Sequence, residues 1–357
     1  GDFYAKPTLS NAYAQKRTPA QLVTTPAAKM VETLAITLMA HTQVLSFDTA
    51  ARTVTLQSSA GVQTLAFSQL VLATGAHPIR VPVAGDAADA VQSVNTLDDF
   101  AAFHQALGVD ASLPDSGKGK TVVVMGAGLI GCEFANDLAQ AGVHVHVSDL
   151  APRPLAALLP EAASQQLETA LAGLGIDWHF GTSVAKVEHG EGKRLSVTLS
   201  DGRSLVADSV LSAIGLRADT ELALSAGLVC ERGVVVNALL ETSAPGVYAL
   251  GDCVQYESAG HRTLPYVMPV MTAARALAAT LAGTPTEVVF PLMPVSVKTP
   301  ALPLVVAAAH PAVAGDWEAE GGEGAWRFVD KAGVQRGFVL AGKSTARRME
   351  MSKLTTQ

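Results

Sequence analysis

The segment TVVVMGAGLIGCEFANDLAQ contains three glycines with the spacing G-x-G-x-x-G, at Gly126, Gly128 and Gly131. A valine-rich run precedes them, and a helical pattern that begins at Leu129 and Ile130 follows them, so the glycines occupy a turn from a strand into a helix. Gly126 permits the tight turn, Gly128 lets a diphosphate approach bare backbone, and Gly131 lets the helix pack close to the strand. The helix N-terminus then faces the phosphates. We expect these five residues to bind a dinucleotide.

The next strand, VHVHVSD, ends in Asp149, which lies 18 residues after Gly131. A carboxylate at this place accepts hydrogen bonds from both ribose hydroxyls and repels a 2′-phosphate. The sequence therefore favours NADH over NADPH. Arg153 lies close by and is the residue that could accommodate the 2′-phosphate of NADPH.

Continuous apolar runs that end in glycine are typical of parallel strands buried on both faces. Such runs occupy residues 69–76, 121–128, 209–216 and 246–252. Amphipathic segments typical of helices lie between or after them, at 129–141, 161–173 and 270–282. The pattern predicts an α/β fold.

Two further segments suggest where domains begin. Thr96 with Asp99 three residues later forms a capping box, which predicts a helix from about Leu97. The stretch 108–120 is rich in Gly, Ser, Pro and Asp and is expected to be a loop. Beyond about residue 286, Gly and Pro separate short β-like runs, and KAG is expected to form a hairpin turn. We expect a small β-containing domain at the C-terminal end.

Composition excludes several classes of function. The net charge of −7 disfavours nucleic acid as a partner, because phosphates are held by concentrated Lys and Arg. The longest apolar stretch, from Leu264, is interrupted by Arg275 and two prolines and does not predict a membrane span. Cys132, Cys230 and Cys253 lie far apart without a metal-binding spacing. We expect a cytoplasmic protein that contacts neither a membrane nor a metal ion.

Several segments carry a more specific likeness: GDFYAKPTLS, LVLATGA, GAGLIGCEFANDLA, TSAPGVYALGDC, YVMPVMTAARALAATLAG and PVSVKTPALPLVV. On these segments the chain resembles the FAD-dependent pyridine nucleotide oxidoreductases. These are two-dinucleotide flavoproteins in which an NAD domain is inserted into an FAD domain. The resemblance implies Rossmann-like FAD and NAD domains followed by a small C-terminal domain.

This architecture explains why the fingerprint at Gly126 comes more than a hundred residues into the chain. The resemblance implies that residues 1–95 are the first part of the FAD domain and residues 226–285 its second part. The NAD domain would occupy residues 96–225 between them, and a C-terminal α/β domain would occupy residues 286–357.

The resemblance also implies roles for individual residues. Lys6 and Glu133 would lie at the reacting ring of the flavin, and Asp252 would bind its ribityl hydroxyls. The residues expected to contact FAD are Lys6, Pro7, Thr74, Gly75, Gly251, Asp252, Tyr266, Val267 and Lys298. Those expected to contact NAD are Gly126, Gly128, Leu129, Ile130, Gly131, Glu133, Asp149 and Gly215.

Three of these residues also have plain structural interpretations. Asp252 could be a helix N-cap, and Glu133 could simply favour the dipole of the fingerprint helix. Lys298 could be a solvated surface lysine.

The implied activity is electron transfer from NADH through FAD to a small, acidic one-electron iron carrier such as rubredoxin. A flavin is needed because a hydride brings two electrons and a Cys-ligated iron accepts one. The redox-active cysteine pair of disulfide reductases is not found. Alternative acceptors are a ferredoxin or oxygen. A further alternative is a non-catalytic fragment, because the family's first FAD fingerprint, in a unit of about forty residues, is not found upstream of FYAKP.

Overall fold

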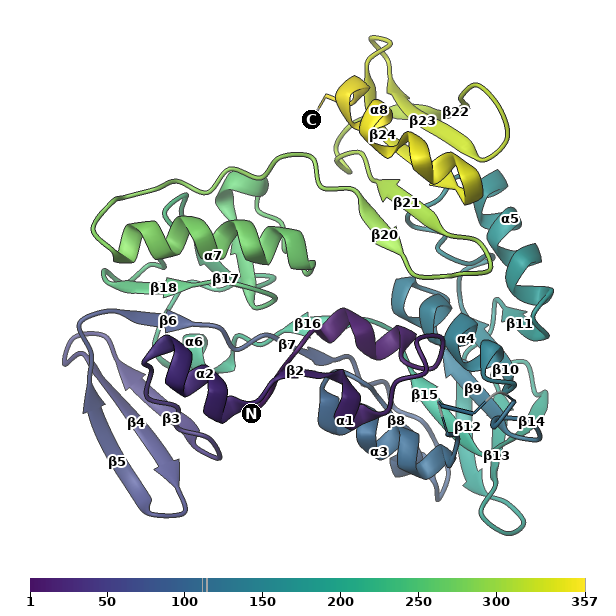
Figure 1. The fold of residues 1–357 in the computed structure, drawn as a ribbon, viewed down its shortest axis with the longest axis horizontal. Helices are drawn as coiled ribbons and strands as arrows, with labels where there is room; N and C mark the ends of the chain where they lie inside the picture. Colours follow the sequence, from purple (N-terminus) through teal and green to yellow (C-terminus); the bar gives the residue numbers. More distant parts are fainter. Residues whose placement is uncertain (111, 114, 357) are drawn as a thin grey trace. The chain divides into compact units, whose positions relative to one another are not determined.

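The computed structural model describes residues 1–110, 112–113 and 115–356. The chain forms two compact units that are each assembled from separate segments (Figure 1). The first unit contains Gly1, Ala28–His77 and Leu216–Met293. The second contains Asp2–Ala27, Pro78–Gly215 and Pro294–Gln357.

The second unit is built around a parallel sheet whose strands lie in the order β11, β10, β9, β15, β8. Its central strand β9 is buried along its whole length, which explains its unbroken apolar sequence. The strands are β8 (Val91–Gln92), β9 (Thr121–Met125), β10 (His144–Asp149), β11 (Ile176–Phe180) and β15 (Ser209–Ser212).

Three helices accompany this sheet: α3 (Leu97–Leu107), α4 (Leu129–Gln140) and α5 (Glu161–Ala172). Helix α4 packs on β9 and β10, and α5 packs on β11. The predicted capping box starts α3, because Thr96 Oγ1 accepts a hydrogen bond from the Asp99 N–H at 3.1 Å and the Asp99 carboxylate accepts one from the Thr96 N–H at 2.8 Å.

A five-stranded antiparallel sheet forms the end of the second unit, in the order β20, β21, β24, β23, β22. Its elements are β20 (Val295–Val297), β21 (Leu304–Ala307), β22 (Gly315–Ala319), β23 (Ala325–Asp330), β24 (Gln335–Ala341), η4 (Gly342–Arg347) and α8 (Arg348–Leu354). Leu304 and Val339 of this sheet share one hydrophobic core with Val124 and Phe134 of the parallel-sheet layer.

The remaining elements of the second unit are short. An antiparallel sheet contains β12 (Val184–His189), β13 (Leu195–Leu199) and β14 (Ser204–Ala207), and η2 (Ala88–Ala90) precedes β8. The amino-terminal segment contributes β1 (Phe3–Tyr4), η1 (Lys6–Asn11), α1 (Pro19–Leu22) and β2 (Val23–Thr25). Segment η1 contacts both α3 and α4.

The first unit has its own core, which includes Leu72, Val247, Tyr256 and Leu277. One antiparallel sheet contains β3 (Gln43–Asp48), β4 (Thr53–Ser58) and β5 (Gly61–Ala66). The other strands pair two by two: β6 (Leu70–Leu72) with β18 (Val247–Ala249), β7 (Ala76–Pro78) with β16 (Leu216–Ala218), and β17 (Val234–Val236) with β19 (Val254–Tyr256). Its helices are α2 (Ala27–Leu34), α6 (Glu221–Ser225), η3 (Glu257–Ala259) and α7 (Val267–Leu281).

The four predicted buried strands correspond to β6, β9, β15 and β18, and they pair in parallel as expected. The predicted helices correspond to α4, α5 and α7, and the KAG turn joins β23 to β24. The predicted loop at 108–120 contains no helix or strand among its described residues, and residues 111 and 114 lie outside them. The α/β prediction is therefore confirmed.

The compact units do not divide the chain at the predicted domain boundaries of 95, 225 and 285. The units change at 77/78, 215/216 and 293/294, and residues 2–27 pack with the second unit. Residues 2–27 belong to the second unit because η1 contacts α3 and α4. Contact units and dinucleotide domains are different divisions, and the four-part domain assignment stays a prediction.

Candidate functional site

The fingerprint glycines of the second unit each have the geometry that their predicted role requires. Gly126 has φ +103°, and a side chain there would lie 2.7 Å from the Ala213 carbonyl oxygen. A Cβ at Gly131 would overlap the Gly126 carbonyl oxygen. At Gly128, by contrast, no heavy atom lies within 4 Å of the Cβ position. The structure thus leaves space beside backbone at Gly128, where Leu129 and Ile130 begin α4, and closes it at the other two glycines.

Asp149 lies at the carboxyl end of β10, beside the fingerprint loop. Its Oδ2 accepts a hydrogen bond from the Ala127 N–H at 2.5 Å, and its Oδ1 accepts one from the Ala151 N–H at 2.7 Å. The half-buried carboxylate predicted to bind the ribose therefore also holds the fingerprint loop in place. Gly215, with φ +111°, follows β15 at the same edge of the sheet.

Arg153, the residue predicted to allow NADPH, donates to the Leu159 carbonyl at 2.9 Å. It also lines a cavity of about 640 Å³ together with Trp317, Trp326 and Phe328. This contact holds the guanidinium within the loop after β10.

Helix α4 buries polar side chains on the face that packs against other segments. Glu133 is completely buried, and its carboxylate accepts hydrogen bonds from the Ser10 hydroxyl at 2.5 Å and from the Lys298 N–H at 2.9 Å. It also forms an ion pair with the Lys298 ammonium, whose side chain is 27% exposed. A buried carboxylate requires such partners, because removing it from water is costly. Glu133 is therefore more than a charge that favours the helix dipole, and Lys298 is more than a solvated lysine.

Asp137, one helical turn after Glu133, is also buried. It accepts hydrogen bonds from the Tyr13 N–H at 3.0 Å and the Ala14 N–H at 2.7 Å. Burial raises the pKa of Asp137 to about 6, although these backbone donors act in the opposite direction. Between the two acids, Asn136 accepts a hydrogen bond from the Ala301 N–H at 3.1 Å. The Asp137 bonds attach α4 to the amino-terminal segment that carries Lys6, and the Asn136 bond attaches it to the segment after β20.

Sequence reasoning singled out Glu133 but missed Asn136, Asp137 and Ser10. The available signal was the spacing of Glu133, Asn136 and Asp137 at i, i+3 and i+4, which places three polar groups on one side of a helix. A helix that follows a buried parallel strand has little exposed surface for such groups, so partners elsewhere in the chain were to be expected.

Lys6 and Pro7 begin η1, and both are exposed. Pro7 suits this place, because its fixed φ favours the first turn of a helix. The same short element carries Ser10, so η1 presents Lys6 to the surface and binds Glu133 at its buried side.

In the first unit, Thr74 and Gly75 follow β6 at its carboxyl end. Thr74 Oγ1 donates to the Asp219 carbonyl at 2.8 Å, and the Gly75 carbonyl accepts from the Asp219 N–H at 3.0 Å. Gly75 has φ +77°, and no heavy atom lies within 4 Å of its Cβ position. His77 lies in β7, with its Nε2 3.1 Å from the Asp219 carboxylate.

Gly251 and Asp252 follow β18, the strand that pairs with β6. Gly251 has φ +92° and open space at its Cβ position, and its N–H donates to the Tyr256 hydroxyl at 3.2 Å. Asp252 lies at the carboxyl end of a parallel strand, where α/β proteins bind ligands. It does not begin any described helix, so the helix N-cap interpretation of Asp252 is wrong.

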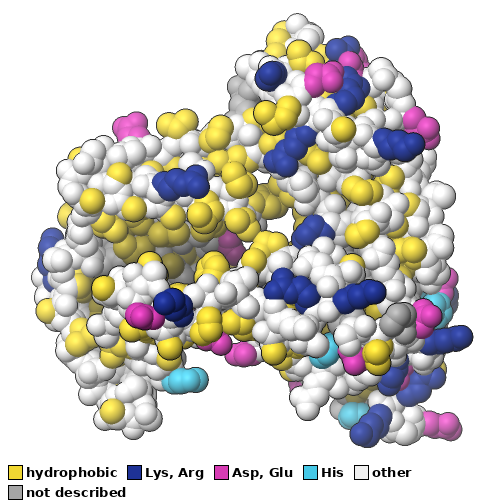
Figure 2. All heavy atoms as spheres, viewed as in Figure 1, with side chains coloured by type: hydrophobic (Ala, Val, Ile, Leu, Met, Phe, Trp, Pro, Cys, Tyr) yellow, Lys and Arg dark blue, Asp and Glu magenta, His cyan; other side chains and the backbone are white. Residues whose placement is uncertain are grey.

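Exposed apolar side chains lie at the start of α7. Tyr266 is 38% exposed, Val267 is 50% exposed and Met268 is 54% exposed. Figure 2 shows hydrophobic side chains across the surface of the unit that carries α7. An exposed apolar surface fits a flat aromatic ring better than it fits bulk water. The residues of the first unit therefore fit the predicted flavin.

Comparison with known proteins agrees with this geometry. The family model for pyridine nucleotide-disulphide oxidoreductases matches residues 2–277. The chain belongs to the pyridine nucleotide-disulphide oxidoreductase family. A second model, described as a rubredoxin binding C-terminal domain, matches residues 287–355.

Two similar relatives are rubredoxin-NAD(+) reductases. The one from Acinetobacter baylyi is 42% identical over 98% of this chain and 88% of its own length. The one from Alcanivorax borkumensis is 42% identical over 99% of this chain and 89% of its own length. The covalent complex of putidaredoxin reductase with putidaredoxin matches with a TM-score of 0.86 and 25% identity, over 99% of this chain and 84% of the solved chain.

Within this family, the chemistry depends on whether cysteines lie at the flavin. All three cysteines of this chain are free thiols. Cys132 on α4 is fully buried, and burial raises its pKa far above that of an ordinary thiol, so it remains protonated.

Among the described residues, every helix is too short or too polar to traverse a lipid bilayer.

The glycine geometry predicts that two single-methyl substitutions both weaken NADH binding but differ in their effect on stability. Gly131→Ala should lower both stability and NADH affinity, because its Cβ overlaps the Gly126 carbonyl oxygen. Gly128→Ala should leave the unfolding temperature within about a degree of wild type but raise the Kd for NADH at least about tenfold, because the methyl group fills space reserved for the diphosphate. Fluorescence titration with NADH and thermal unfolding measure the two effects. Normal NADH affinity in Gly128→Ala would contradict the placement of the diphosphate.

Asp137 predicts a specific dependence of stability on pH. Its pKa rises from 3.8 to about 6 on folding, so the folded protein keeps a proton that the unfolded chain releases in this range. The stability contributed by Asp137 should therefore fall as the pH rises from about 4 to 6, by up to about 3 kcal/mol, and then level off. Asp137→Asn cannot titrate. The difference in unfolding free energy between wild type and variant should shift by this amount between pH 4 and 6.5 in urea titrations, with circular dichroism confirming that both proteins are folded. A constant difference would count against the raised pKa.

Proposed function

We propose that the chain transfers electrons from NADH through bound FAD to rubredoxin or a similar small iron carrier. The observation that carries this proposal is the match of residues 287–355 to a rubredoxin-binding domain in a chain that also contains a complete dinucleotide fingerprint. The names of the two 42% identical relatives support the same acceptor.

The NADH site proposed for the second unit uses the edge where β9, β10 and β15 end. Gly128 receives the diphosphate, with the N–H groups of Leu129 and Ile130 at the helix N-terminus, while Gly126 and Gly131 allow the tight turn and the close packing of the helix. Asp149 binds the adenosine ribose while it fixes the loop through the Ala127 N–H. Gly215 and Glu133 are proposed to lie along the nicotinamide half. The carboxylate at Asp149 supports NADH as the coenzyme.

The flavin contacts proposed for the first unit are Thr74, Gly75, Gly251, Asp252, Tyr266 and Val267. Those proposed for the second unit are Lys6, Pro7, Glu133 and Lys298. When bound, FAD supplies the chemistry that neither unit has, since it accepts a hydride and passes on its electrons one at a time.

The chain's own residues hold charged groups in fixed positions and neutralise one another's charge. The Glu133 carboxylate fixes the Lys298 ammonium, so this cation keeps one place instead of sampling many rotamers. The Ser10 hydroxyl fixes η1 to the same carboxylate and thereby restricts Lys6. The apolar side chains of Tyr266 and Val267 would exclude water from the flavin ring that they contact.

The proposed partner surface lies at η4 and α8. Arg336 and Arg347 are paired with acids, at 2.7 Å from Asp330 and 2.7 Å from Glu350 respectively. Lys343 and Lys353 are exposed, and so are the apolar side chains of Met349 and Leu354, at 70% and 55%. Apolar contact surface with lysines around it suits an acidic protein partner.

We also propose a cytoplasmic location. Three thiols without a disulfide suit a reducing compartment, and NADH is the coenzyme of such a compartment.

The decisive experiment is anaerobic spectroscopy of the purified chain. A flavin absorption band should bleach on addition of NADH and return when oxidised rubredoxin is added, with two rubredoxins reduced per NADH. Gly128→Ala should retain the band but bleach only at much higher NADH concentration. Faster reoxidation by a ferredoxin or by oxygen would identify that molecule, and not rubredoxin, as the acceptor. A chain without flavin absorption would support the non-catalytic alternative.

Charge at η4 and α8 should control the encounter with rubredoxin. Lys343→Gln combined with Lys353→Gln should slow rubredoxin reduction several-fold at low ionic strength, and the difference should vanish at high salt because exposed charges are then screened. Lys331→Gln, an exposed lysine in the β23–β24 hairpin, is the matched control. Stopped-flow absorbance measures the rate. An equal loss in the control variant would rule out a specific steering surface.

A further inference from the structure

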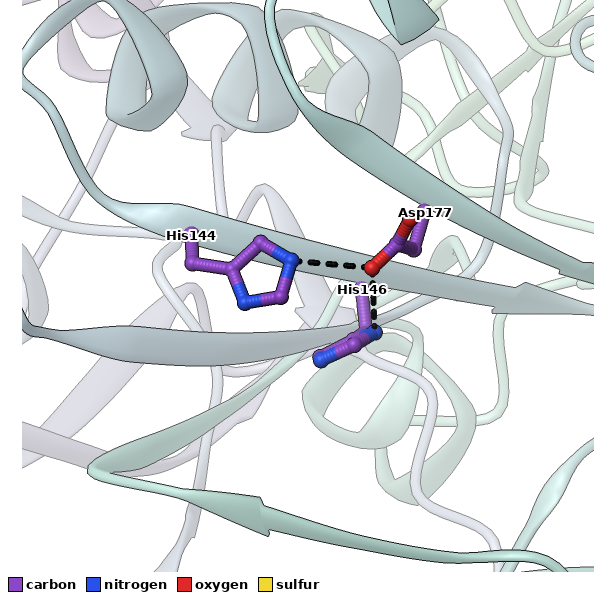
Figure 3. Close-up of side chains that lie close together, drawn as sticks. All are labelled: His144, His146 and Asp177. Carbon is purple, nitrogen blue, oxygen red and sulfur yellow. Dashed lines mark hydrogen bonds and ion pairs between the residues drawn. The ribbon is translucent and has the colours of Figure 1, made fainter.

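Two adjacent parallel strands, β10 and β11, place four polar side chains on one face of the second unit's sheet. His144 and His146 alternate along β10, so they share a face, and His146 lies opposite Asp177 in the strand register. His179 follows two residues later on β11. The acid, Asp177, comes from the neighbouring strand β11 (Figure 3).

The ring nitrogens and the carboxylate converge. His144 Nε2 lies 2.8 Å from Asp177 Oδ2, and His146 Nδ1 lies 3.4 Å from the same oxygen. All three donor atoms lie within 4.8 Å of one another. Two ligands of one tetrahedral zinc ion, at bond lengths of about 2.0–2.1 Å, are about 3.3 Å apart. The two separations from Asp177 Oδ2 are close to this value, and the nitrogens of His144 and His146 lie within 4.8 Å of each other, so side-chain rotations can bring all three atoms onto one ion.

We propose that His144, His146 and Asp177 form a binding site for a divalent transition-metal ion of the zinc class. Two imidazoles and one carboxylate are the ligand set that zinc accepts while it keeps a position for water. His144 and Asp177 are half-exposed, which gives the ion a path from solvent, and His146 is 13% exposed and gives the site a fixed inner ligand.

Neighbouring groups prepare His146 for this role. Arg203 donates to His179 Nδ1 at 2.9 Å, which leaves the proton of His179 on Nε2. That N–H faces His146 Nδ1 at 3.1 Å, so His146 Nδ1 carries a lone pair. A metal ion takes the lone pair in place of the weaker hydrogen bond from His179.

The positive charge of Arg203 does not oppose the ion strongly. Its guanidinium is paired with Asp201 at 2.6 Å. The proposed site is also separate from the NADH site, since His144 begins β10 and Asp149 ends it, roughly 17 Å away along the strand. A bound ion would join β10 to β11 and leave the coenzyme edge untouched.

The test is calorimetric titration of the tag-free, full chain with zinc chloride in a buffer that does not chelate metal. We expect one ion per chain, and His144→Gln, His146→Gln and Asp177→Asn should each weaken binding at least about tenfold. His189→Gln is the matched control, because His189 is exposed on the separate sheet that contains β12. Zinc should raise the unfolding temperature of wild type but not of His146→Gln.

Three outcomes would overturn the proposal. The first is zinc binding that stays unchanged in all three ligand variants, and the second is no binding below millimolar zinc. The third concerns the ligand set: His179→Ala should bind zinc at least as tightly as wild type, because it removes the competing hydrogen bond. A loss in His179→Ala equal to that in His146→Gln would refute the three-residue assignment.

Discussion

The burial of the Glu133 carboxylate in the fingerprint helix constrains much of the second unit. A charge without solvent needs donors, and Glu133 obtains them from the Ser10 hydroxyl, the Lys298 N–H and the Lys298 ammonium. These donors come from η1 and from the segment after β20, which lie far apart in the chain. One buried charge thus fixes the positions of three chain segments, and the same helix begins at the site proposed for the coenzyme diphosphate.

A second constraint acts at the edge of the parallel sheet. Strands β9, β10 and β15 end side by side, so the backbone that follows them must turn in very little space. Gly126 and Gly131 meet this demand because a methyl group on either would touch neighbouring backbone. Asp149 stabilises the result through the Ala127 N–H. The coenzyme site that we propose therefore lies on a surface that strand packing has already shaped.

Local sequence was sufficient for the parts of the structure that depend on local physics. The capping box at Thr96 and the glycine turn at Gly126 each involve groups a few residues apart, and each appears as predicted. The partners of Glu133 and Asp137 were not predictable in this way, because Ser10 and Tyr13 lie more than a hundred residues earlier in the chain.

The roles of several single residues also depend on partners that lie far away in the chain. Lys298 reads as an ordinary surface lysine until its buried acid is known, and Asp177 gains meaning only when β11 aligns it with His146. The division into compact units escaped the sequence for the same reason, since η1 is assigned by its contacts with α3 and α4 and not by its place in the chain.

The interleaved composition of the second unit bears on how the chain is synthesised. Its segments are separated by long stretches of the first unit, and the contacts of Glu133 span 123 residues in one direction and 165 in the other. Such distant contacts form late, because chain closure must precede them. During translation Ser10 and Glu133 both leave the ribosome well before Lys298 does. Until then the carboxylate of Glu133 must keep its water, and the emerging chain must hold an unfinished core in solution.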